Sequence, residues 1–172
     1  QSDMPTMLES NSYDTACHEH LEYYGLSQIK WMSDHVGFSI IDVEFNDING
    51  GSFSVTVKKS IKGKDSCHSQ VIDDILKNER DLKLNSLNPY IKFSERVKKL
   101  KTELIDFVSK VKSDNKTICV LGASTKGNVL LQYCEFTEKD IPYVGEVNPE
   151  KYGHYTPGTK IPIISEDELM EK

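Results

Sequence analysis

The run His18-Glu19-His20 places three titratable side chains next to one another. A carboxylate that orients an imidazole makes a general base, because the unperturbed imidazole pKa of about 6.5 suits proton abstraction near neutral pH. Two histidines on one side of an extended segment are also typical of a metal site, but few other ligands stand at workable spacing. A solvated polar loop before a helix explains the same residues without any chemistry, and all three interpretations stay open.

A second candidate site is the segment Gly122-Ala-Ser-Thr-Lys-Gly-Asn128, which follows a short apolar strand. Such a loop presents backbone N–H groups and the positive end of a helix to an anion, and Ser124, Lys126 and Asn128 add side-chain donors. The segment matches neither GxGxxG nor GxxxxGK[ST], so neither dinucleotide binding nor ATP hydrolysis follows. Phosphate binding and a tight turn that uses glycine for its geometry both fit the pattern.

A third polar loop, 152–159, contains Tyr155-Thr-Pro-Gly-Thr159 after a predicted strand. Loops that follow strands often bind ligands in α/β folds, and a purely structural loop fits this segment equally well. The four cysteines, at positions 17, 67, 119 and 134, form no CxxC pair. They are therefore expected to be inert, reduced thiols rather than zinc ligands or a disulfide framework.

The N-terminal block is expected to form a helix and a β-hairpin. A helix over 27–35 would begin with Ser27 as its N-cap, and residues 1–25 are expected to be irregular. β-Branched and aromatic residues over 39–45 predict a strand that turns at Asn49-Gly50-Gly51 and pairs with the segment beyond. The buried face of that strand is expected to hold Ile41, Val43 and Phe45.

The middle block is polar and helical, with a weaker helix expected over 69–80. A longer helix of about six turns begins near Pro89, where apolar residues at alternating spacings of three and four form one stripe. This stripe is expected to pack against a neighbouring domain, with a coiled-coil dimer as the alternative. The stripe consists of Tyr90, Phe93, Val97, Leu100, Leu104, Phe107 and Val111.

The C-terminal block is predicted to be a βαβ unit. Its strands are expected over 117–121 and 141–147, with the glycine loop and a helix over 129–136 between them. A right-handed crossover makes the two strands parallel. Ser165 is expected to cap a final helix.

Composition limits the class of protein. The chain has 172 residues, 37% of them hydrophobic and 28% charged, which is enough to bury a core. Its 21 basic residues are outnumbered by 27 acidic residues, which argues against a nucleic-acid partner. No apolar run approaches the roughly 20 residues of a membrane helix, and the first ten residues do not resemble a secretion signal. A cytoplasmic location away from membranes is therefore expected.

Motifs at 5–15, 17–27, 45–52, 122–128 and 148–162 stand in the order in which sugar C-methyltransferases carry them. Through these motifs the chain resembles that S-adenosylmethionine-dependent family over nearly its whole length, with the helical middle least distinctive. The resemblance implies an α/β fold in three parts. These are the second half of a class I methyltransferase domain with a helix and β-hairpin (1–60), a helical connection (61–115) and a truncated Rossmann-like βαβ C-terminal domain (116–172).

The resemblance also implies a reaction, namely methylation of a carbon next to the keto group of a deoxysugar linked to a nucleoside diphosphate. His20 matches the proposed base, Glu19 would orient or polarise, and His18 would contact the sugar. The nucleotide-sugar substrate is assigned to Ser124, Lys126, Asn128, Tyr155 and Thr159.

The implied cofactor is S-adenosylmethionine, with its binding motif largely outside this chain, and no metal is expected within it. The chain begins at Gln1 and is expected to be an excised piece that is inactive alone. Two alternatives stay open, a methyltransferase with an oxygen or nitrogen acceptor and a non-catalytic α/β nucleotide-binding module. The sugar, the carbon that is methylated, the nucleotide base and the oligomeric state are not determined by the sequence.

Overall fold

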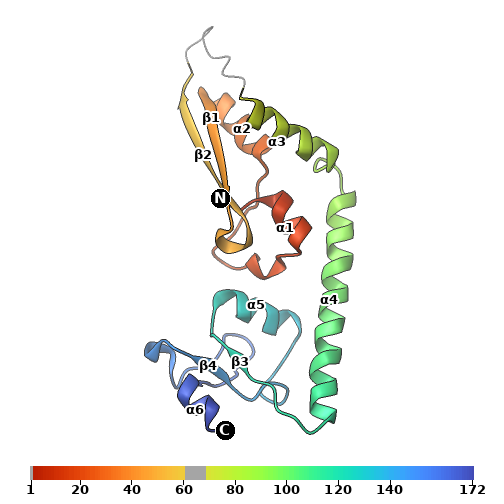
Figure 1. Cartoon of the computed structure of the whole chain (residues 1–172), viewed down its shortest axis with the longest axis vertical. Helices are drawn as coiled ribbons and strands as arrows, with labels where there is room; N and C mark the ends of the chain where they lie inside the picture. The colour runs from red at the N-terminus through yellow and green to blue at the C-terminus, as the bar shows by residue number, and fades with distance from the viewer. Residues whose placement is uncertain (1, 61–68) are drawn as a thin grey trace. The chain divides into compact units, whose positions relative to one another are not determined.

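The computed structural model describes residues 2–60 and 69–172 (Figure 1). Contacts divide the chain into two units, each with its own hydrophobic core. Unit 1 comprises Gln1–Tyr13 and Glu19–Arg96, and unit 2 comprises Asp14–His18 and Val97–Lys172. No helix in the described part of the chain is long and apolar enough to cross a bilayer.

The prediction that residues 1–25 are irregular was wrong, because unit 1 begins with helix α1 (Met4–Ser10). The Asp3 carboxylate caps this helix by accepting the Thr6 N–H at 2.9 Å, and Pro5 lies in the first turn. Asn11 ends the helix in the left-handed conformation, with φ 56°. An N-cap aspartate, a first-turn proline and a C-terminal asparagine are local sequence signals that predict the two ends of this helix.

Helix α2 (Leu26–His35) starts one residue before its predicted position, and Ser27 is not its N-cap. Gly25 occupies the N-cap position and has no side chain that could cap the helix. Its own N–H donates to Oε1 of Gln28 at 2.9 Å. The N–H groups of the first turn donate instead to the carboxylate of Glu79, a buried residue of helix α3 (Gln70–Asp81). A carboxylate distant in sequence thus replaces the local hydroxyl.

Strands β1 (Phe38–Asn46) and β2 (Ser52–Lys59) form the predicted antiparallel hairpin. The predicted buried face was partly wrong, because the register shifts between Ile40 and Asp42. This bulge puts Ile40 rather than Ile41 on the buried face with Val43. Phe45 shares the face of Val43 in the regular register beyond the bulge and is 52% exposed. Helices α2 and α3 pack on the hairpin and contribute Leu26 and Ile72 to the core of unit 1. The other members of this core are Ile40, Val43 and Phe53.

Helix α4 (Asn88–Ser113) confirms the long helix of the middle block. Its buried residues are Val97 and Val108, whereas the predicted stripe member Phe107 is 57% exposed. Val97 and Val108 are about three full turns apart at 3.6 residues per turn, so both lie on the same side of the helix. Alternating spacings of three and four average 3.5 residues per turn, so a stripe with that pattern rotates slowly around the helix away from this side. Val108 belongs to the core of unit 2, and most of α4 is itself part of that unit, so this part of the stripe packs within unit 2. Packing of the stripe against a neighbouring domain stays a prediction.

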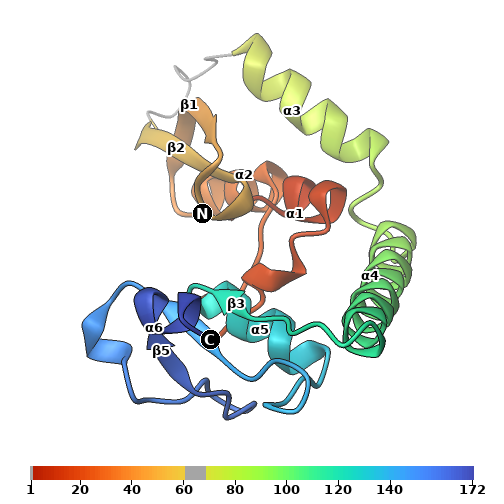
Figure 2. The same cartoon turned by 60° about the horizontal axis from the view of Figure 1, so that its bottom comes forward.

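Unit 2 contains the predicted parallel βαβ arrangement. It also contains one further strand, β5 (Ile163–Ser165), which Figure 2 labels. Its sheet has the order β3 (Val120–Leu121), β4 (Val144–Glu146) and β5 (Ile163–Ser165), and all neighbours are parallel. Ser165 caps helix α6 (Glu166–Met170) as predicted. The core cluster consists of Val108, Leu131, Cys134, Phe136, Ile141, Val144, Ile161 and Ile163.

Helix α5 (Thr125–Tyr133) connects β3 to β4 and begins inside the glycine-containing segment. The prediction that this helix starts at Val129 was therefore wrong. Ser124 has extended backbone angles, and its Oγ accepts the Gly127 N–H at 3.0 Å, which is N-cap geometry. The segment is thus half loop and half first helical turn.

Candidate functional site

The glycine loop, residues 122–128, joins the carboxyl end of β3 to the first turn of α5. Gly122 lies at φ 87°, a conformation that glycine adopts without strain, and it turns the chain out of the sheet. The hydroxyl of Ser124 is occupied as the helix cap. Of the three predicted side-chain donors in this loop, Ser124 therefore has a structural role in the described fold.

The first turn of α5 leaves donors available. Among the described residues, the backbone N–H groups of Thr125 and Lys126 have no hydrogen-bond partner, and the Lys126 ammonium makes no ion pair. Asn128 contributes a buried Oδ1 that also lacks a partner within the described part of the chain. Unpaired first-turn N–H groups and a nearby ammonium favour an anion, while the amide oxygen would accept a hydrogen bond from a hydroxyl.

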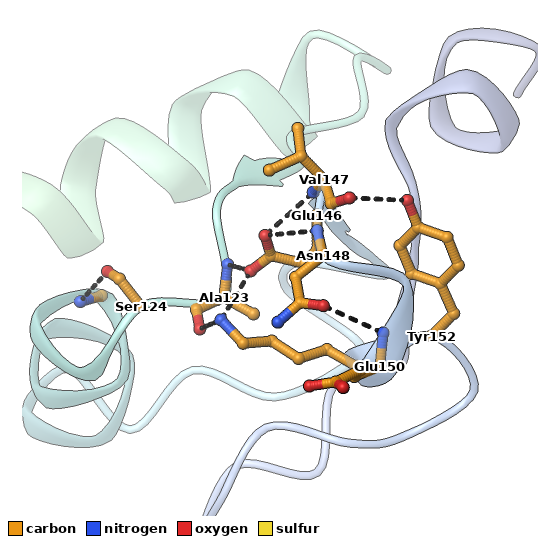
Figure 3. Close-up of polar contacts among 9 residues, drawn as sticks. Ala123, Ser124, Glu146, Val147, Asn148, Glu150 and Tyr152 are labelled. Atoms are coloured by element: carbon orange, nitrogen blue, oxygen red, sulfur yellow. Dashed lines mark hydrogen bonds and ion pairs between the residues drawn. The ribbon is translucent and has the colours of Figure 1, made fainter.

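Glu146, the last residue of β4, lies beside this loop and is 6% exposed (Figure 3). Its Oε2 accepts the Ala123 N–H and a Lys151 Nζ proton, each at 2.9 Å. Its Oε1 accepts the N–H groups of Val147 at 2.9 Å and Asn148 at 3.0 Å. A carboxylate has about four acceptor positions, so these four donors fill them.

These donors hold the pKa of Glu146 at about 2, below the ordinary 4.5. The largest cause is the Asn148 N–H bond, followed by the Lys151 ammonium, and burial opposes both. The sequence pattern did not single out Glu146. A signal was present, since an acid at the end of the second βαβ strand, about 20 residues after the glycine loop, is a common ligand position.

Acid is expected to weaken unit 2 through Glu146. Because its folded-state pKa lies below its ordinary value, ionised Glu146 stabilises the fold above about pH 4.5, and this contribution is lost as the pH falls toward about 2. In Glu146→Gln, the free energy of unfolding is expected to be lower at neutral pH and to fall less steeply with acid. Urea unfolding followed by circular dichroism at several pH values measures this slope, and parallel profiles for the two proteins would contradict it.

Tyr155 and Thr159 lie at the other end of α5 from Lys126. Gln132, in the last turn of α5, donates to the carbonyl of Pro157 at 3.0 Å, and Tyr155 pairs with the segment that leads into the amino end of β5. The Thr159 hydroxyl is 2.6 Å from that of buried Thr156, which indicates a role in shaping the turn. The structure therefore separates these two residues from the glycine loop.

An open cavity of about 670 Å³ lies at this second position. Its lining residues are Thr137, Glu138, Lys139, Tyr155, Thr159 and Lys160. The assignment of Tyr155 and Thr159 to the substrate stays a prediction. The two residues lie in a different region of unit 2 from Lys126 and Asn128.

His20 lies in unit 1 with defined contacts on one side of its ring. Its Nδ1 is 3.2 Å from the Oγ of buried Ser2, and the ring stacks on Tyr23 with centroids 6.2 Å apart. With Nδ1 paired to a hydroxyl, Nε2 is the nitrogen that remains for proton transfer. Ser2 was not among the predicted site residues, because nothing in its local sequence links it to His20.

The other two members of the histidine run, His18 and Glu19, are exposed. The residue that contacts Nδ1 of His20 is Ser2, so the structure supplies a hydroxyl where Glu19 was expected to orient the ring. The roles of His18 and Glu19 stay predictions.

The described cysteines are free thiols. Cys134 is buried, and burial raises the pKa of its thiol, which keeps it protonated and unreactive. Cys119 is exposed and Cys17 partly buried. Cys67 lies outside the described residues.

Two comparisons with known proteins bear on this arrangement. The family model described as the C-methyltransferase C-terminal domain matches residues 47–172. C-methyltransferase NovU of Streptomyces niveus is 28% identical over 162 residues, which cover 94% of this chain and 38% of NovU. The chain thus spans less than half the length of this relative. The family match starts in the hairpin connection, and the predicted domain boundaries near 60 and 115 stay predictions.

Proposed function

The chain belongs to the C-methyltransferase C-terminal domain family, and from that membership we propose that it is part of an S-adenosylmethionine-dependent C-methyltransferase. The acceptor in this proposal is a keto-deoxysugar carried on a nucleoside diphosphate. The observation that supports an anionic acceptor is the first turn of α5, where the N–H groups of Thr125 and Lys126 are unpaired within the described residues. Lys126 adds a positive charge there.

Methylation at carbon needs a base, because a C–H bond next to a ketone is acidic only when the enolate that forms is stabilised. In the proposed mechanism, Nε2 of His20 removes this proton. The Ser2 hydroxyl holds Nδ1 and thereby fixes the ring, with the proton on Nδ1 in the reactive tautomer. Glu19 and His18 would assist as a polarising group and a sugar contact. The enolate carbon then attacks an electrophilic methyl group.

S-adenosylmethionine would supply that methyl group as part of a sulfonium ion, whose sulfur would leave as a neutral thioether. The βαβ unit of this chain does not fit the cofactor, because the acid that would accept ribose hydroxyls, Glu146, already accepts four hydrogen bonds. We therefore assign cofactor binding to parts of the enzyme that this chain does not span. The residues described here serve the acceptor.

Lys126→Ala is expected to weaken binding of a thymidine diphosphate sugar about tenfold, because it removes the ammonium while leaving the cap and the helix intact. Calorimetric titration of the chain measures this loss. Lys116→Ala is a matched control, since Lys116 is an exposed lysine outside the loop. Unchanged affinity in Lys126→Ala would remove the loop from the substrate site.

A further inference from the structure

We propose that Glu146 and Lys151 are positioning residues that hold the glycine loop in the conformation that binds the substrate's diphosphate, an inference that rests on the proposed function. The pair is not offered as a direct ligand contact. Its role is to act on the backbone between β3 and α5.

The argument begins with Ala123, the residue between the turn at Gly122 and the helix cap Ser124. Its N–H donates to the Glu146 carboxylate at 2.9 Å, and its carbonyl accepts from Lys151 Nζ at 3.0 Å (Figure 3). One residue is therefore held through both of its backbone polar groups. Because Ala123 directly precedes the cap, rotation of its peptide groups would redirect the first-turn N–H groups of α5.

The anchoring pair is itself held in place from the neighbouring strand. Glu146 accepts the N–H groups of Val147 and Asn148, so its carboxylate is fixed to the end of β4. Lys151 reaches it from the short 3-10 helix η3 (Pro149–Lys151) and forms an ion pair at 2.9 Å. The loop is thus tied to the adjacent strand end rather than stabilised only by its own turn.

Charge explains why a paired carboxylate suits this position. A bare carboxylate beside an anion-binding helix end would repel a diphosphate, since both are negative. The Lys151 ammonium and the backbone donors offset the charge of Glu146. The carboxylate therefore serves as a rigid multiple acceptor at a limited electrostatic cost.

Glu146→Gln tests this assignment, because an amide keeps the shape but has one acceptor oxygen and presents N–H groups to donors. Lys151→Met is the second variant, since it removes the ammonium and leaves the backbone bonds of Glu146. Glu150→Gln is the matched control, an exposed neighbour whose change of charge is identical. The measurements are amide hydrogen exchange by NMR and calorimetric titration with thymidine diphosphate.

In Glu146→Gln, exchange at Ala123 is expected to be at least about tenfold faster, while exchange at the core amide of Val108 rises only as far as the lower free energy of unfolding of unit 2 requires. The dissociation constant for thymidine diphosphate is expected to rise about tenfold, and Lys151→Met should show a smaller change in the same direction. A merely structural role would lower the free energy of unfolding and leave the affinity of the folded protein for thymidine diphosphate unchanged.

Unchanged exchange at Ala123, or faster exchange with unchanged affinity, would overturn the positioning role while the proposed function stands. Equal effects in Glu150→Gln would overturn it too, because they would show a general effect of charge. Absence of thymidine diphosphate binding in the parent chain would overturn both the positioning role and the proposed function. Measuring the parent chain before the variants distinguishes this outcome from the others.

Discussion

His20→Ala, in a methyltransferase that contains this chain, is expected to lower kcat for carbon methylation by about 10²- to 10⁴-fold. The reason is that the reaction has no nucleophile until a proton leaves carbon, and His20 is the residue to which the proposal gives this step. Affinities for the cofactor and the nucleotide sugar should change little, because the imidazole acts on a C–H bond. Steady-state kinetics with separate kcat and KM values measure the effect.

His35→Ala is a suitable control for this experiment. His35 is exposed at the end of α2 and stacks on Trp31, with ring centroids 5.1 Å apart, so its loss removes an imidazole without touching Ser2 or His20. Activity that survives in His20→Ala would contradict the enolate mechanism. It would favour an oxygen or nitrogen acceptor, since a heteroatom nucleophile needs less help from a base.

Gly51→Ala is expected to destabilise unit 1 by about 3 kcal/mol or more. Gly51 lies at φ 118°, and a Cβ at this position would stand 2.2 Å from Cγ2 of Thr6. Thr6 cannot easily yield, because Asp3 accepts hydrogen bonds from both its N–H and its hydroxyl. Backbone strain and overlap therefore add together. Equilibrium unfolding in urea, followed by the fluorescence of Trp31, measures the loss.

Gly37→Ala separates these two causes. Gly37 also has a positive φ, at 84°, but a Cβ there would meet no heavy atom within 4 Å. Its replacement should cost only the backbone strain, about 1 kcal/mol. Equal losses in the two variants would show that close approach to Thr6 contributes nothing and would contradict the account of the hairpin turn.

Local signals predicted the features that depend on neighbouring residues. Glycines at the hairpin turn, the cap at Ser165 and the parallel pairing of β3 and β4 were all confirmed. Each is set within a few residues of chain or by the handedness of the crossover. The same class of signal marks the start of α1 at Asp3.

Contacts between distant segments explain what the sequence did not predict. The carboxylate of Glu79 stands more than 50 residues from the helix it caps, so no local rule favours Gly25 over Ser27. The bulge between Ile40 and Asp42 inverts part of the expected face, because strand pairing rather than alternation decides which side chains are buried.

The candidate site follows the same division. Lys126 and the helix end could be predicted, since the order of strand, glycine loop and helix is written in adjacent residues. Three of the four bonds of Glu146 come from residues within five positions of it, and only the bond from Ala123 joins a distant segment. That bond forms because β3 and β4 lie side by side. The pairing of Ser2 with His20 depends likewise on folding.

The most direct test of the central claim is calorimetric titration of the chain with a thymidine diphosphate sugar and, separately, with S-adenosylmethionine. We expect saturable binding of the nucleotide sugar and no binding of the cofactor, because the loop at α5 serves the acceptor and the saturated carboxylate of Glu146 does not fit ribose hydroxyls. Tight binding of S-adenosylmethionine without the nucleotide sugar would contradict the account and make the glycine loop the cofactor site.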